Sequence, residues 1–144
     1  MRTKQLSIFL ENKTGRLANI TKMLGDAGIN ILALSLADTS DFGILRIIVD
    51  DFERAQSLLK TSNVVSKLSE VTAVEVADKP GGLAKLLETL DGNGVNVEYM
   101  YAFSESKTGR AALIFRFDDP ETAVKCLSEA GVNVFSEFDL AGRS

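Results

Sequence analysis

Glu11-Asn12-Lys13-Thr14-Gly15-Arg16-Leu17 is a polar stretch centred on a glycine, and it joins a predicted strand to a predicted helix. A similar stretch, Ala77-Asp78-Lys79-Pro80-Gly81-Gly82-Leu83, returns later, so that Gly15 and Gly81 lie 81 − 15 = 66 residues apart. The same spacing relates further identical residues, which are Leu17 and Leu83, Ala18 and Ala84, Leu24 and Leu90, Gly28 and Gly94, and Asn30 and Asn96. So many identities at one offset indicate a duplicated unit.

The repeat divides the 144 residues into two domains, 1–69 and 70–144. A domain of roughly 70 residues buries only about 60% of the surface that its unfolded chain exposes, and is marginally stable alone. We therefore expect the two domains to pack side by side.

In the first domain, hydrophobic periodicity predicts four strands and two helices. The strands are Thr3–Leu10, Asn30–Ala37, Gly43–Val49 and Val64–Leu68. The first helix follows Gly15, ends at Gly28, and places Leu17, Ile20, Met23, Leu24 and Ala27 on one apolar face. The second helix is short, with Asp51 as its N-cap.

The second domain repeats this plan. Its strands are Val71–Val76, Asn96–Phe103, Ala111–Phe117 and Val132–Leu140, and no proline or glycine separates the first of them from the strand before it. One helix carries Leu83, Leu86, Leu87 and Leu90 and is closed by Gly92 and Gly94. The other begins with Asp119 and Pro120 and ends before Gly131. Since Asp50-Asp51 corresponds to Asp118-Asp119, the Glu105–Gly109 hairpin is predicted to be about two residues longer.

Each domain thus reads βαββαβ, the ferredoxin-like arrangement of the α+β class, with both helices on one face of an antiparallel sheet. Right-handed crossovers give the strand order 4-1-3-2. In the first domain, alternation places Leu32, Leu34 and Leu36 on one side of the second strand and Ile31 and Ala33 on the other. Because both sides are apolar, we expect the helix-free face to be buried in a homodimer. The alternative is a few exposed aliphatic side chains.

Composition excludes several classes of protein. A net charge of −4 and a pI near 4.9 argue against nucleic-acid binding. No apolar run approaches the ~20 residues of a membrane span. The N-terminus lacks the apolar region of a signal peptide, so a cytoplasmic location is the default expectation. Cys126, the single cysteine, is expected in the core.

The repeated loops suit a zwitterionic amino acid. A carboxylate binds the unpaired N–H groups at a helix start, and Gly15 and Gly81 allow close approach of the backbone. An ammonium group needs acceptors, which loop carbonyls, Asn12 or Asp78 supply. Asn30 and Asn96 open the second strands and carry both a donor and an acceptor. The alternative is that the asparagines and glycines serve only as turn formers.

Gly15-Arg16-Leu17 with Gly28-Ile29-Asn30-Ile31, and Asp78 to Leu83 with Gly94-Val95-Asn96-Val97, resemble the ACT domain, a small-molecule regulatory module of amino-acid metabolism. The resemblance covers nearly the whole chain as two tandem copies. It implies an effector site between the first loop of one domain and the second strand of the other. The residues so implied are Asn12, Lys13, Thr14, Gly15, Arg16 and Leu17 with Asn96 and Val97, and Asp78, Lys79, Pro80, Gly81, Gly82 and Leu83 with Asn30 and Ile31.

The chain departs from the family pattern at two positions. Thr14 stands where the motif usually has proline, and Leu10 stands where some serine-binding members carry histidine. Asn12 and Asp78 also differ at equivalent places, so the two pockets are not expected to be equally good. The first loop is the preferred ligand site.

Little in the sequence supports an enzyme. The chain has no histidine, which is the commonest general base, and no motif for a metal, phosphate or cofactor. We expect a non-catalytic sensor that binds a free amino acid and exerts allosteric regulation on a partner in trans or on its own assembly. The alternatives are a regulatory subunit resembling the acetohydroxyacid synthase small subunit, and an oligomerisation module without a ligand.

Overall fold

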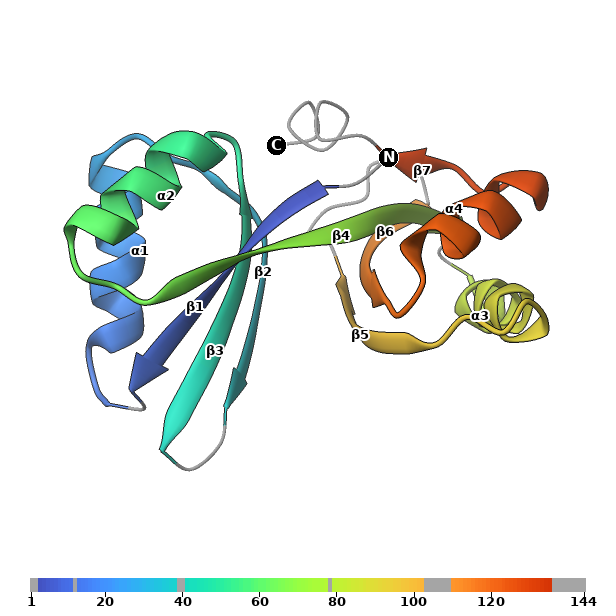
Figure 1. Cartoon of the computed structure of the whole chain (residues 1–144), viewed down its shortest axis with the longest axis horizontal. Coiled ribbons are helices and arrows are strands. Elements are labelled where there is room, and N and C mark those ends of the chain that lie inside the picture. The colour runs from blue at the N-terminus through green and yellow to red at the C-terminus, as the bar shows by residue number, and fades with distance from the viewer. Residues whose placement is uncertain (1–2, 12, 39–40, 78, 103–109, 136–144) are drawn as a thin grey trace. The chain divides into compact units, whose positions relative to one another are not determined.

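The structure, a computed structural model, describes residues 3–11, 13–38, 41–77, 79–102 and 110–135. The chain forms two compact units, Lys4–Ser69 and Glu70–Ser144 with Met1–Thr3, here called the first and the second unit. Strand β4 (Ser66–Ala77) passes without a break from one unit into the other, as the absence of proline and glycine predicts. Both units have the predicted α+β, ferredoxin-like architecture (Figure 1).

In the first unit, strand β4 neighbours β1 (Thr3–Glu11), then come β3 (Phe42–Val49) and β2 (Ile31–Asp38), which is the predicted order 4-1-3-2. Helices α1 (Arg16–Asp26) and α2 (Phe52–Thr61) lie on one face of this sheet (Figure 1). Leu6 pairs with Ile47 and Ile8 with Leu45 in the antiparallel register of β1 and β3. These four side chains are buried against the helices in one core cluster with Leu24 and Leu59.

The second unit repeats the order, with β7 (Val134–Phe135), β4, β6 (Arg110–Phe117) and β5 (Val97–Ala102) side by side. Helices α3 (Gly82–Gly92) and α4 (Pro120–Glu129) cover one face of its sheet. The core contains the stacked rings of Phe115 and Phe117, and Cys126 as predicted. The predicted hairpin at 105–109 and most of the predicted last strand, 132–140, lie outside the described residues.

The four helices of the described residues end in the same way. A residue with positive φ follows the C-cap, and the next residue donates its N–H to the carbonyl five positions earlier, as in the Schellman motif. The donor and acceptor pairs are Ile29 to Leu24, Val64 to Leu59, Val95 to Leu90 and Val132 to Leu127. The residue with positive φ is Gly28, Gly94 or Gly131 in three helices, but Asn63 in α2. The predicted glycine stops are confirmed, except that Gly92 is still helical.

The predicted alternation of the second strand is wrong at its start, because the strand contains a β-bulge there. The pairing of β2 with β3 shifts register between Ile31 and Ala33, so Leu32 no longer lies on the side of Leu34 and Leu36. Leu34 and Leu36 pair with the core residues Ile47 and Leu45, and therefore lie on the helix-bearing side of the edge strand. They remain 55% and 48% exposed. An inserted residue cannot be read from a pattern of leucines, because both registers bury apolar side chains.

Two residues of the predicted apolar helix faces are also more exposed than expected. Leu17 and Leu83, in the first turns of α1 and α3, are each 39% exposed. The other predicted residues of α1 are buried or pack against the core. The first turn therefore lies beyond the edge of the core, next to the glycine at which each helix begins.

Candidate functional site

The two predicted glycine corners have nearly identical backbones. Gly15 and Gly81 are the N-caps of α1 and α3, with left-handed φ values of 89° and 83°. In each corner the residue after the glycine donates its N–H to the residue two positions before the glycine, Arg16 to Lys13 and Gly82 to Lys79. A glycine has no side chain with which to cap, so the next two N–H groups, those of residues 17–18 and of residues 83–84, remain open to a ligand. Such a helix start attracts a carboxylate.

Charged side chains surround the first corner. Lys13 Nζ lies 2.9 Å from Glu11 Oε2, and the described residues from Lys13 to Leu17 are all exposed. The hydrogen bond and charge of Lys13, together with the charge of Arg16, lower the pKa of Glu11. Asn12 lies outside the described residues. The corner therefore offers a cation on each side of the glycine, Lys13 before it and Arg16 after it.

The second corner is tighter. A Cβ atom added to Gly82 would overlap the carbonyl oxygen of Ala77, so only glycine fits there. A cavity of about 400 Å³ lies beside this corner, lined by Lys79 to Gly82 and also by Lys85, Thr89 and Gly131. Its volume falls in the range of small-molecule sites. Sequence reasoning missed Lys85, Thr89 and Gly131, since they meet the loop only in the folded unit. Asp78 lies outside the described residues.

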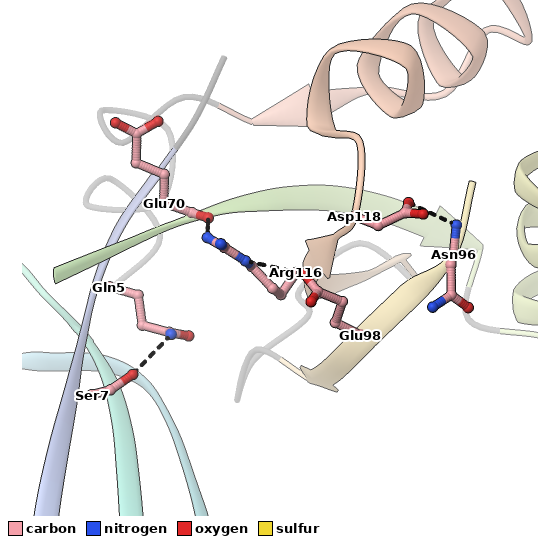
Figure 2. A network of polar contacts seen from close by, with 7 residues as sticks. All are labelled: Gln5, Ser7, Glu70, Asn96, Glu98, Arg116 and Asp118. Atoms are coloured by element: carbon pink, nitrogen blue, oxygen red, sulfur yellow. Dashed lines mark hydrogen bonds and ion pairs between the residues drawn. The ribbon is translucent and has the colours of Figure 1, made fainter. Parts of the chain in front are cut away.

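The two asparagines are held by a backbone clamp that the sequence analysis did not foresee. The N–H of Asn96 donates to Asp118 Oδ1 at 2.9 Å (Figure 2). The N–H of Asp118 donates back to the Asn96 carbonyl at 3.1 Å. Asn30 and Asp50 make the same two bonds. In each pair of neighbouring aspartates the first residue thus holds the strand start, while the second, Asp51 or Asp119, caps a helix as predicted.

The clamp uses the backbone of each asparagine and leaves the side chain available. Within the described part of the chain, the amide groups of Asn30 and Asn96 make no hydrogen bond, and both residues are exposed. In Figure 2 the Asn96 amide points away from Asp118. The next residues, Ile31 and Val97, anchor the strand starts by packing on the two cores.

Neither unit brings its own glycine corner to its own asparagine. The corner precedes α1 or α3 and the asparagine follows the same helix, so the 11 residues of that helix separate them. At 1.5 Å per residue this is roughly 16 Å. A ligand the size of an amino acid does not span that distance. One such ligand therefore does not contact the glycine corner and the asparagine of the same unit.

The described residues contain no group of three or more acidic, histidine or cysteine side chains placed to hold a metal ion. None of the helices in these ranges has the length and apolarity needed to cross a bilayer.

This chain is similar in sequence to one curated protein and similar in fold to a solved structure. The acetolactate synthase small subunit of Buchnera aphidicola subsp. Baizongia pistaciae (strain Bp) is 30% identical over 80 residues, which cover 55% of this chain. The chain thus spans about half the length of this curated relative, 50%. The ligand-free regulatory subunit of aspartate kinase from Thermus thermophilus is 17% identical, with a TM-score of 0.64 over 88% of this chain and 91% of that one, and shows the same fold.

The similarity is much greater for protein BT0572 from Bacteroides thetaiotaomicron. Its crystal structure matches with a TM-score of 0.92 and 39% identity, over 98% of this chain and 96% of that one. The family described as ACT domain pair matches residues 1–142, which is nearly the whole sequence. The duplicated fold, its glycine corners and this match agree, and the chain belongs to the ACT domain pair family.

Proposed function

We propose that this chain is a non-catalytic sensor that binds a free amino acid and regulates a partner or its own assembly. The observation that carries the proposal is that each unit has both an uncapped helix start led by a glycine and an asparagine whose amide makes no hydrogen bond to any described residue. Open N–H groups suit the α-carboxylate, and an asparagine amide can bind either main-chain group of the ligand. The chain belongs to the ACT domain pair family, and the ACT domain is a small-molecule regulatory module, which supports the same role.

The proposed pockets combine the two domains. One joins the corner from Asn12 to Leu17 with Asn96 and Val97, and its mate joins the corner from Asp78 to Leu83 with Asn30 and Ile31. Support comes from the separation of these features within a unit, since no unit can form the site from its own corner and its own strand. A ligand that bridges two domains favours the docked arrangement by its differential affinity. Occupancy would thereby change domain packing, which a partner can read.

A thermal-shift screen against the common L-amino acids tests the proposal. A ligand at 100-fold excess over its Kd adds about 2.7 kcal/mol to the free energy of unfolding. For a chain of this size the melting temperature should rise by roughly 5–10 °C. A melting temperature that is the same with every amino acid would contradict the proposal and favour an oligomerisation module.

The variant Asn96→Ala identifies the site. It removes the amide but keeps the backbone clamp to Asp118, so the fold should persist while the ligand-induced shift disappears. Asn93→Ala is the matched control, because Asn93 is the C-cap of α3, its amide donates to the Thr89 carbonyl, and it lies outside the proposed site. If Asn96→Ala unfolds the protein instead, the asparagine is a turn former.

A second candidate is a regulatory subunit of an amino-acid biosynthetic enzyme. The observation in its favour is the 30% identity over 80 residues to an acetolactate synthase small subunit. Co-purification from the native cytoplasm with a large catalytic chain would support this candidate. Recovery of this chain alone, with an intact amino-acid response, would favour the stand-alone sensor.

Homodimerisation through the helix-free sheet face is part of the proposal. On this face of the first unit Phe9 is 45% exposed and Phe42 is 59% exposed, while their neighbour Ile44 is half-buried. The equivalent of Phe9 in the second unit is the charged Glu75. Sedimentation should show a dimer that Phe9→Glu converts to a monomer, whereas a monomeric native protein would contradict this part of the proposal.

A further inference from the structure

The two strand starts that carry the asparagines differ in the residues directly after them. Each second strand has a β-bulge at the same place, between Ile31 and Ala33 in β2 and between Val97 and Tyr99 in β5. The bulged residue is Leu32 in the first unit and Glu98 in the second. Bulges often re-aim side chains beside functional sites.

The residue on the neighbouring strand also differs between the units, since it is apolar in the first unit and charged in the second. Ala33 pairs with Ile48, and its equivalent Tyr99 pairs with Arg116. Leu32 and Ile48 are 4% and 3% exposed. In the second unit the same two positions hold a charged pair, since Arg116 Nε lies 3.4 Å from Glu98 Oε1. The bulge next to Asn30 is thus apolar, and the bulge next to Asn96 is polar.

Two of the three guanidinium nitrogens of Arg116 have partners among the described residues. Its Nη1 donates to the Glu70 carbonyl at 3.0 Å, while its Nε faces Glu98 (Figure 2). Among the described residues Arg116 makes no further hydrogen bond, so its Nη2 group has no partner there. The Glu98 and Arg116 side chains remain 48% and 38% exposed. An exposed, long ion pair contributes little to stability, and stability alone does not explain the pair.

The position of Arg116 places it at the proposed site. Val97, the residue after Asn96, pairs with Phe117, and Arg116 precedes Phe117 on β6. Since Phe117 faces the core, Arg116 lies on the other face of the sheet. Two residues further along, Asp118 holds the Asn96 backbone.

We infer that Glu98 and Arg116 determine specificity at the Asn96 end, and that they select an effector with a carboxamide side chain. The inference rests on the proposed function. A guanidinium donor and a carboxylate acceptor lie side by side and match the oxygen and the NH₂ group of an amide. An apolar side chain would cover Arg116 Nη2 and Glu98 Oε2, which the ion pair leaves open, without giving either a hydrogen bond. A carboxylate side chain would be opposed by Glu98, and an ammonium side chain by Arg116.

Calorimetric titration with isosteric or near-isosteric pairs tests the inference. The probes are L-asparagine against L-leucine and L-aspartate, and L-glutamine against L-methionine and L-glutamate. The native protein should bind one of the two amides at least about 10-fold more tightly than its apolar and charged counterparts, which is the effect of one hydrogen bond to a charged group. Arg116→Met should abolish this preference. Ile48→Met, at the equivalent position of the first unit, should leave it unchanged.

The outcomes separate the inference from the proposed function. If leucine, methionine or the acidic amino acids bind as tightly as the amides, or if Arg116→Met keeps the preference, the inference is wrong while the sensor stands. If no amino acid binds the native protein, both fail. Arg116→Lys keeps the positive charge but loses the planar fork, and serves if Arg116→Met does not fold. It should likewise lose the preference for the amide.

Discussion

Asn96 and Asp118 are joined by two hydrogen bonds of 2.9 and 3.1 Å, and Asn30 and Asp50 are joined by two bonds of the same lengths. The asparagines lie 96 − 30 = 66 residues apart, but the aspartates lie 118 − 50 = 68 apart. The two extra residues therefore fall between strands β5 and β6, and the clamp is the same in both units. Such a bond fixes the start of the second strand independently of the length of the hairpin.

The clamp can be tested by removing its acceptor. Asp118→Ala should lower the free energy of unfolding by about 1 kcal/mol, since it deletes a hydrogen bond to the Asn96 N–H. Asp118→Asn keeps an oxygen at Oδ1 and should lose less. Urea titration followed by circular dichroism measures both variants. Equal losses would show that the carboxylate charge, and not the hydrogen bond, stabilises the strand start.

The second glycine corner should be sensitive to a single methyl group. Gly82→Ala should lower the free energy of unfolding by about 1–3 kcal/mol, the usual cost of overpacking, because its Cβ would overlap the Ala77 carbonyl oxygen. Gly92→Ala, at the other end of α3, is the matched control. A Cβ there meets nothing within 4 Å, and alanine favours the helix, so this variant should be slightly more stable. Similar losses in both variants would contradict the tight corner.

The architecture could be predicted because the sequence repeat and the hydrophobic periodicity indicate the same order of strands and helices. The offset between Gly15 and Gly81 revealed the duplication, and polar residues before each helix marked its start. Asp51 and Asp119 accept from the N–H of Arg54 and Thr122 as predicted for N-caps. These signals are local, since a cap or a left-handed glycine acts within a few residues of itself.

The features that were missed depend on contacts between distant residues. The bulge at Leu32 is set by pairing with β3, and both registers place apolar side chains on both faces of β2. The pair of Glu98 and Arg116 joins β5 and β6 at the corresponding bulge of the second unit, so no spacing in the sequence indicates it. Asp118 and Asp119 are neighbours in the sequence but bond to different elements, and the sequence alone gives Asp118 no partner.

The end of α2 offers a stabilising substitution. Asn63 has a φ of 57° at the position where α1, α3 and α4 have glycine. A side chain is disfavoured in this conformation, so Asn63→Gly should raise the free energy of unfolding by up to about 1 kcal/mol. The reciprocal variant Gly131→Asn should lower it by a similar amount. Thermal unfolding checks both, and a destabilised Asn63→Gly would show that the Asn63 side chain contributes more than its backbone conformation costs.

The cap of α4 should make stability depend on pH in the acidic range. The Thr122 hydroxyl donates to Asp119 Oδ2 at 2.6 Å and, with the Thr122 N–H, lowers the pKa of Asp119 below its ordinary value of 3.8. Because the folded state favours the ionised form, this stabilisation is complete above the ordinary pKa and is lost as the pH falls through the lowered one. Thr122→Val should raise the pKa of Asp119 toward 3.8, measured by NMR titration of its carboxyl carbon. Thr122→Ser keeps the hydroxyl and should leave the pKa low, whereas equal values in both variants would show that the backbone N–H alone lowers it.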